Sequence, residues 1–148
     1  MFFERLKVVA ENFILTSKEK NIKILSHCDA DGISSASIFI KMLLNMGNNF
    51  QLRIVKQLTK EIIDEFELRD ELLVLLDCGS GYPYLFKEIL EKTKVLVIDH
   101  HFPVDFNHPN FLHLNPMLDG ICGFSASMVT YLFAKTVDEK NKELVDLA

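Results

Sequence analysis

Three short apolar runs, each followed at once by Asp and His residues, constrain this chain more than any other feature. The runs cover residues 22–25, 72–76 and 95–98. Their length and aliphatic content are typical of strands that are buried on both faces of a sheet. Amphipathic helical patterns lie between them. This alternation predicts an α/β fold with a mostly parallel β-sheet and helices on both faces.

Periodicity and turn residues predict the remaining elements. Further strands are expected over residues 50–55 and 111–114. Helices are expected over 2–19, 34–46, 60–68 and 84–91, from Ser125 or Ser127 to Lys135, and as a last helical pattern over 139–148. Gly47 ends the second of these helices, and Thr59 is a candidate cap for the third.

Length and composition bound the class of protein. With 148 residues, 49% hydrophobic content and twelve Phe, the chain can bury one substantial core, which favours a single domain over residues 1–148. The formal net charge of −5 argues against binding nucleic acid through a broad basic surface. It does not exclude a nuclease, because acidic residues at a site are compensated by the cations that they hold.

Cysteine spacing and hydropathy bear on the compartment. The three cysteines are widely spaced, so neither a disulfide framework nor a structural zinc site is indicated, and a reducing cytoplasm fits. The N-terminus lacks the pattern of a signal peptide, and no run reaches the ~18 apolar residues that a membrane span needs. We therefore expect a soluble, cytoplasmic protein without a membrane partner.

Candidate metal ligands follow all three apolar runs. They are His27, Asp29 and Asp31 after the first run, Asp77 after the second, and Asp99, His100 and His101 after the third. Because parallel strands end at one edge of their sheet, residues far apart in the sequence are expected to share a pocket there. Each cluster alone would favour turns or helix caps. Together they would leave uncompensated charge without a cation, so the joint pattern favours a metal site.

The ligand types indicate which metal and which chemistry. An Asp-rich set with one or two His suits Mn²⁺, with Mg²⁺ as the alternative. Asp29 and Asp31 lie on one face if the strand continues, or converge in a loop tightened by Gly32. Asp77 is expected to bridge two ions, and His100 to reach one of them. Two ions ~3.5 to 4 Å apart activate water and clamp a phosphoryl group, which predicts a metal-dependent phosphoesterase.

Other polar residues receive less specific expectations. Asp99 is either a ligand or the partner that orients a histidine. Ser125 and Ser127 precede a helix, where they either bind a phosphate or form an ordinary N-cap. His108 and His113 are expected to be hydrogen-bonded or solvated rather than metal ligands. Three basic residues are expected to be solvated surface, namely Arg53, Lys56 and Lys60.

These motifs resemble those of the DHH phosphoesterases. His-Cys-Asp-Ala-Asp-Gly at 27–32, Asp-Cys-Gly at 77–79 and Asp-His-His at 99–101 are similar to motifs I, II and III of that family. The continuation of motif I into Ile-Ser-Ser, and Asn115-Pro116 before a Gly-rich turn, most resemble archaeal RecJ-like single-strand exonucleases. The resemblance covers residues 20–148.

The resemblance implies roles for individual residues in hydrolysis of phosphodiesters at a two-Mn²⁺ site. His27 and Asp29 would serve one ion, Asp31 and His100 the other, and Asp77 both. His101 would contact the scissile phosphate or support protonation of the leaving group, and Asp99 would orient the histidines.

The resemblance also implies parts that this chain lacks. Family members usually supply a further metal-binding Asp after the third motif and a separate C-terminal substrate-binding domain, and the chain stops at Ala148 before that position. We therefore expect the catalytic half of a longer protein, with a second ion that is under-coordinated and weakly held, and with weak activity or none as an isolated chain.

The leading functional prediction is an exonuclease domain that acts on single-stranded DNA or RNA, in DNA repair or replication. A DHH enzyme that acts on short oligonucleotides, cyclic dinucleotides or pyrophosphate would use the same ions. A different class is a scaffold subunit with little activity that binds a protein of the replication complex. Lost ligands would mark that scaffold role, and motifs I to III are intact.

Overall fold

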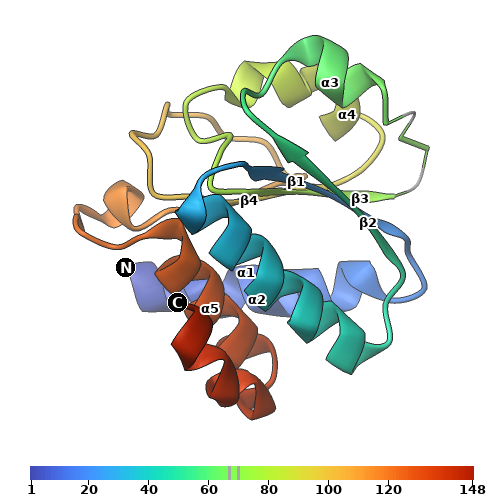
Figure 1. Cartoon of the computed structure of the whole chain (residues 1–148). Coiled ribbons are helices and arrows are strands. Elements are labelled where there is room, and N and C mark those ends of the chain that lie inside the picture. Colours follow the sequence, from blue (N-terminus) through green and yellow to red (C-terminus); the bar gives the residue numbers. More distant parts are fainter. Residues whose placement is uncertain (67, 70) are drawn as a thin grey trace.

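The computed structural model describes residues 1–66, 68–69 and 71–148, and they form a sheet covered by helices on both faces (Figure 1). The sheet has five strands in the order β2-β1-β3-β4-β5, and all its neighbours pair in parallel. The predicted α/β class is confirmed. The strands are β1 (Ile22–His27), β2 (Phe50–Val55), β3 (Leu72–Leu76), β4 (Val95–Ile98) and β5 (Phe111–Leu114).

Helices divide between the two faces of the sheet (Figure 1). One face carries α1 (Phe2–Ser17), α2 (Ala30–Met46), α5 (Ala126–Val137) and the 3₁₀ segment η3 (Glu139–Leu147). The other carries α3 (Lys60–Asp64), η1 (Pro83–Phe86) and α4 (Lys87–Leu90). A short 3₁₀ turn, η2 (Pro116–Asp119), follows β5. None of the described helices is long and apolar enough to cross a membrane.

Burial on both faces explains why the central strands are continuously apolar. Successive side chains of a strand point to opposite faces. In β3, Val74 therefore packs into the core beneath α1, α2 and α5, whereas Leu75 packs into the smaller core beneath α3 and α4. All five residues of β3 are buried. A charged residue within these runs would be buried without a partner, so the ionisable groups are confined to the strand ends.

Three phenylalanine rings join the helices of the larger core. Phe13 of α1 meets Phe39 of α2 edge to face at 5.6 Å and Phe133 of α5 at 5.3 Å, measured between ring centroids. Phe39 and Phe133 stack on each other at 5.9 Å. The contact fixes α2 and α5 side by side, and both begin near the edge of the sheet at which the strands end.

The strand order creates a crevice at one place along that edge. After β1 the chain forms β2 on one side of it, and then continues with β3, β4 and β5 on the other side. The connections therefore diverge between β1 and β3, and open α/β sheets bind ligands at such a switch point. His27 ends β1 and Asp77 directly follows β3, so these two predicted ligands flank the crevice.

Several element boundaries differ from the prediction. Helix α2 begins at Ala30 rather than at residue 34, because Asp29 has extended backbone angles and accepts a hydrogen bond from Gly32 N at its N-cap. Helix α3 ends at Asp64 rather than at 68, and Glu67 of that predicted segment lies outside the described residues. The helix predicted over 84–91 is divided into η1 and α4, and the last segment is 3₁₀ rather than α-helical.

Candidate metal centre

The structure brings all seven predicted site residues to the carboxyl edge of the sheet. Asp77 is the residue that links them. One group of potential ligand atoms joins it to His27 and Asp29, and a second joins it to His100 and His101, with the atoms of each group within 4.8 Å of one another. The carboxylate of Asp31 reaches the same place, because its Oδ2 lies 3.6 Å from His100 Nε2.

Asp77 has the features expected of a carboxylate that holds a cation. It is only 1% exposed, and neither carboxylate oxygen has a hydrogen-bond partner among the described residues. Burial, followed by the nearby Asp29 and Asp31, raises the pKa of Asp77 to about 7. Its φ of 57° lies in the left-handed region, which a non-glycine residue adopts at some energetic penalty. A buried acid without a donor is costly, and a bound cation would remove that penalty.

Two histidines turn a ring nitrogen toward Asp77. His27 Nε2 donates to the backbone oxygen of Lys56 at 3.1 Å, and His100 Nδ1 donates to that of Phe124 at 2.9 Å. Because a carbonyl only accepts, the bond to Phe124 fixes the tautomer of a neutral His100 ring, whereas both nitrogens of His27 face acceptor oxygens, since its Nδ1 also lies 2.8 Å from Asp29 Oδ2. The other nitrogens lie near Asp77, with His27 Nδ1 3.7 Å from Oδ2 and His100 Nε2 3.4 Å from Oδ1. This is the usual outer support of a metal-binding imidazole.

Helix N-termini hold the two remaining carboxylates. Asp29 caps α2, and the hydrogen bond from Gly32 N, at 2.9 Å, lowers the pKa of Asp29 to about 2 despite some opposing desolvation. Its second oxygen lies 2.8 Å from His27 Nδ1. Asp31 accepts from the backbone N–H groups of Ala126 and Ser127 at 2.7 Å each. The continuing strand is thus wrong, because Asp29 lies in the short loop between β1 and α2 and Asp31 is already in the first turn of α2.

Of the two alternatives for the start of α5, the structure favours the N-cap over the phosphate site. The backbone N–H groups of Ala126 and Ser127 both donate to Asp31, so neither is available to bind an anion from solution. Ser125 is an ordinary N-cap whose Oγ accepts from Met128 N at 3.1 Å. Ser127 Oγ lies 2.8 Å from Ser125 Oγ. The capping alternative therefore describes Ser125, and the helix dipole stabilises a candidate metal ligand.

Asp99 orients His101. It is fully buried, and its Oδ1 lies 2.7 Å from His101 Nδ1 and 2.7 Å from the backbone nitrogen of His100. Burial raises the pKa of Asp99, but hydrogen bonds from Ser80 and His101 lower it by more. The same pairing raises the pKa of His101 against the effect of its partial burial. Nδ1 of His101 is thus engaged by Asp99, which leaves Nε2 as the other ring nitrogen.

A buried polar network behind Asp99 was not predicted from the sequence. Ser80 N donates to Asp99 Oδ2 at 2.9 Å. Asn115 Nδ2 donates to Ser80 Oγ at 2.9 Å and to the backbone oxygen of His101 at 2.8 Å. Ser80 Oγ also lies 2.7 Å from His113 Nε2. Burial lowers the pKa of His113 to about 4, so His113 makes this hydrogen bond as a neutral ring and, as expected, is hydrogen-bonded.

Lys56 also has a role that was not predicted from the sequence. Together with Arg53 and Lys60 it was expected to be plain surface. Arg53 and Lys60 do form ion pairs on the surface, with Glu65 and with Asp64. Lys56, however, supplies the carbonyl that holds His27, and it lines a cavity beside His27, Asp77 and His101. Backbone roles of this kind leave no signal in residue type.

A parallel sheet with carboxylates and histidines gathered at its switch point defines the class of the molecule as an α/β protein with a candidate metal centre at its strand ends. The chain belongs to the DHH family, because residues 21–148 match the DHH family, N-terminal domain. DHH proteins form a superfamily of metal-dependent phosphoesterases, so the predicted class of activity is supported at that level.

Comparisons with individual proteins agree with this family assignment. The chain is 36% identical over 125 residues to an uncharacterized protein of Methanocaldococcus jannaschii, over 77% of this chain and 28% of that protein. Among solved structures, RecJ from Thermus thermophilus in complex with Mn²⁺ has a TM-score of 0.80 at 24% identity, over 97% of this chain and 23% of that one.

Two further solved structures share the fold. Exonuclease RecJ bound to manganese has a TM-score of 0.76 at 23% identity, over 91% of this chain and 37% of that one. CDC45 from Entamoeba histolytica has a TM-score of 0.67 at 18% identity, over 92% of this chain and 30% of that one. These likenesses confirm the RecJ-like fold. The chain spans much less than half the length of each of these relatives.

Proposed function

We propose that this chain is a catalytic domain that hydrolyses phosphodiester bonds of single-stranded nucleic acid with two Mn²⁺ ions. The observation that carries the proposal is the state of Asp77, a buried acid without hydrogen-bond donors among the described residues, which lies between ring nitrogens of His27 and His100. The donor set is rich in carboxylates, which suits Mn²⁺ or Mg²⁺. The proposed ligands are His27, Asp29, Asp31, Asp77 and His100.

Bound divalent ions would supply Lewis-acid polarisation of the phosphoryl group and activation of the attacking water. The protein residues have separate tasks. Asp77, shared by both candidate groups, is proposed to bridge the ions. His101, held through Nδ1 by Asp99, directs Nε2 to the substrate. Its raised pKa favours the protonated ring, which suits contact with a phosphate oxygen or proton donation to the leaving group.

The direct test compares Asp77→Asn with Asp138→Asn, a surface control at the end of α5. Mn²⁺ binding is measured by calorimetry, and hydrolysis is measured on labelled single-stranded DNA and RNA. We expect Asp77→Asn to lose both Mn²⁺ binding and hydrolysis, and the control to keep both. Unchanged Mn²⁺ binding by Asp77→Asn would refute the metal assignment.

The rival substrates require the same ions and are separated by a substrate panel. Single strands, dinucleotides, cyclic dinucleotides and pyrophosphate are incubated with the Mn²⁺-loaded chain, and initial rates are compared. Turnover of pyrophosphate alone would overturn the nucleic-acid proposal.

A scaffold role predicts lost ligands, whereas the other six motif side chains gather around Asp77 in this chain. An enzyme is therefore favoured. Binding to a replication-complex protein, and a place in repair or replication, stay predictions that the fold likeness to CDC45 makes worth testing in a pull-down with the Asp77→Asn variant.

A further inference from the structure

A cavity of about 440 Å³ opens beside the proposed metal ligands and contains two exposed aromatic rings. Its wall includes His27, Asp77 and His101, together with Tyr82 and Phe102. Tyr82 is 61% exposed and Phe102 is 78% exposed. Large aromatic side chains normally bury most of their surface. Two exposed rings in the wall of a cavity beside the proposed metal ligands therefore indicate a binding surface.

The two loops that carry the rings are tied to each other. Val104 N donates to the backbone oxygen of Ser80 at 2.9 Å, which links the loop after β4 to the loop after β3. Tyr82 N donates to the oxygen of Gly79 at 3.1 Å. Each ring residue also precedes a proline, which narrows the range of backbone conformations open to it. The surface is therefore preorganised, and binding to it orders little additional chain.

A positive charge completes the cavity. Lys56 lies in its wall and is exposed. Its carbonyl accepts from His27 Nε2, so the backbone at Lys56 is fixed relative to the proposed metal centre. Its ammonium makes no ion pair with any of the described residues. The cavity thus combines apolar rings with an ammonium that has no carboxylate of its own in the described part of the chain.

We infer that Tyr82 and Phe102 stack on a nucleobase next to the scissile phosphate, while Lys56 contacts a neighbouring phosphate. This inference rests on the proposed function and deepens it, since it assigns the part of the substrate that a pyrophosphate lacks. Every base has a π-face, so stacking binds single strands with little sequence preference. Lysine attracts phosphates regardless of the base.

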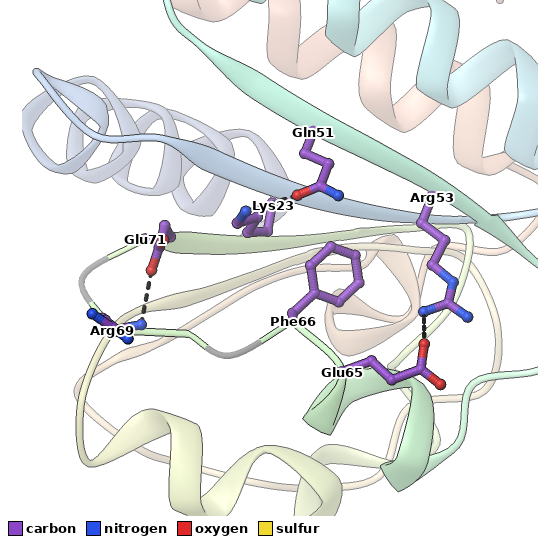
Figure 2. A pocket seen from close by; sticks show the side chains of 7 residues that line it. All are labelled: Lys23, Gln51, Arg53, Glu65, Phe66, Arg69 and Glu71. Carbon is purple, nitrogen blue, oxygen red and sulfur yellow. Dashed lines mark hydrogen bonds and ion pairs between the residues drawn. The ribbon is translucent and has the colours of Figure 1, made fainter.

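Another cavity of about 440 Å³, lined mostly by charged and polar residues, does not suit this role (Figure 2). It lies toward the start of β1 and β2, where Lys23 pairs in register with Gln51, and thus away from the strand ends that carry the ligands. Two of its cationic side chains already have partners, because Arg53 forms an ion pair with Glu65, as Figure 2 shows, and Lys23 Nζ donates to Gln51 Oε1 at 2.7 Å. Its ring, Phe66, is only 8% exposed, so it offers little surface to a base.

The test uses leucine substitutions, which keep an apolar side chain and remove the ring. Tyr82→Leu and Phe102→Leu are compared with Tyr84→Leu. Tyr84 is a matched control because it is 57% exposed, but its ring packs against Phe106 and Lys87 and is not part of the cavity wall. Mn²⁺ binding is measured first, and all three variants should match the wild type.

Affinity is then measured by fluorescence anisotropy in Ca²⁺, and hydrolysis in Mn²⁺, on two single-stranded oligonucleotides. One is unmodified, and the other has abasic tetrahydrofuran residues at both ends. We expect Tyr82→Leu and Phe102→Leu to weaken binding of the unmodified strand by roughly tenfold, with little effect on the abasic strand. Tyr84→Leu should leave both unchanged. Lys56→Gln should weaken both strands alike and reduce the salt dependence of binding.

The outcomes separate the subsite from the proposed function. If the wild type acts on both strands and the two ring variants lose affinity equally for both or for neither, the nucleobase subsite is overturned and the nuclease function stands. If the wild type turns over pyrophosphate but neither binds nor cleaves either strand, the proposed function is overturned, and the subsite with it.

Discussion

Asp77 combines three unfavourable features in one residue. It has a φ of 57°, it is buried, and its carboxylate oxygens lack donors among the described residues. Asparagine has nearly the same shape, tolerates the left-handed region and carries no charge. We therefore expect Asp77→Asn to raise the melting temperature of the metal-free chain at pH 7, measured by thermal unfolding in EDTA. A lower melting temperature would mean that Asp77 has a stabilising partner in the metal-free protein.

The pH dependence of that effect has a definite sign. The pKa of Asp77 is about 7 in the folded chain, above its ordinary value of 3.8. Between these values the folded state keeps a proton that the unfolded state releases, so stability falls as pH rises from about 4 to 7. The loss above pH 7 is on the order of 4 kcal/mol. Urea unfolding in EDTA should show this loss in the wild type and not in Asp77→Asn.

His113 titrates with the opposite effect on stability. Its pKa is about 4 in the folded chain against an ordinary value of 6.5, so the unfolded state binds the extra proton in this range. Stability is therefore lost as pH falls from 6.5 toward 4, by on the order of 3 kcal/mol. We expect His113→Gln to reduce this acid sensitivity. The comparison is made in the Asp77→Asn background, where the opposing effect is removed, and equal slopes would contradict the assignment.

The residue types predicted which side chains lie close together, but not which hydrogen bonds position each of them. The sequence places Asp and His after buried runs, and parallel strands end at one edge, so the meeting at Asp77 was predictable. The donors to Asp31 come from Ala126 and Ser127, more than ninety positions away, and are backbone groups that any residue other than proline supplies. The Ser80 network depends in the same way on tertiary contacts.

At the scale of elements, the start of α5 acts as a clamp on Asp31. Ala126 occupies the first helical position, where proline is well tolerated but has no N–H. Ser125 has a ψ of 161°, which suits a residue before proline. Ala126→Pro should therefore keep the helix and remove one donor to Asp31. We expect Mn²⁺ affinity to fall by about 10- to 100-fold, as for other outer partners of metal ligands.

The matched control for this clamp is Lys60→Pro, which makes the same change at the first position of α3, far from the ligands in the sequence. Thr59 has a ψ of 162°, so the backbone is equally suitable. Calorimetric Mn²⁺ titrations should distinguish the two variants. A similar loss in both would mean that α5 contributes only general stability.

The junction between β1 and α2 allows a second test at this scale. A Cβ at Gly32 would lie 2.2 Å from the backbone oxygen of His27, so Gly32→Ala must displace the loop that carries Asp29 and Asp31. We expect a loss of at least about 2 kcal/mol in unfolding free energy, typical of overpacking, together with weaker Mn²⁺ binding. Gly47→Ala is the control, because its Cβ meets open space and only its φ of 75° is unfavourable.

The same junction explains why the start of α2 was predicted too late. Ala30-Asp31-Gly32 includes residues of low helix propensity, so periodicity begins to indicate a helix only at Ser34. In the structure the cap at Asp29 and the hydrogen bond from Ser26 Oγ to the oxygen of Gly32, at 2.7 Å, start the helix earlier. Local propensity could not reveal this, since the contact joins a buried strand residue to the helix.

At the scale of the whole molecule, metal binding should couple to both stability and protonation. The chain has a net charge of −5, and four carboxylates of the site lie at one edge of the sheet. A cation that binds only the folded state stabilises it by mass action. Because Asp77 holds a proton below about pH 7, that proton must leave when a metal binds. Mn²⁺ affinity should therefore rise by about tenfold per pH unit between pH 5 and 7 and level off above it.

Thermal unfolding with saturating Mn²⁺ tests this coupling across the same pH range. The rise in melting temperature caused by Mn²⁺ should be larger at pH 8 than at pH 5.5. Calorimetry in buffers of different ionisation enthalpy should detect the released proton near pH 6.

An affinity that is independent of pH would show that Asp77 is already ionised in the metal-free protein. The folded chain would then have to contain a donor for its carboxylate, and the case for a cation at this position would lose its main support.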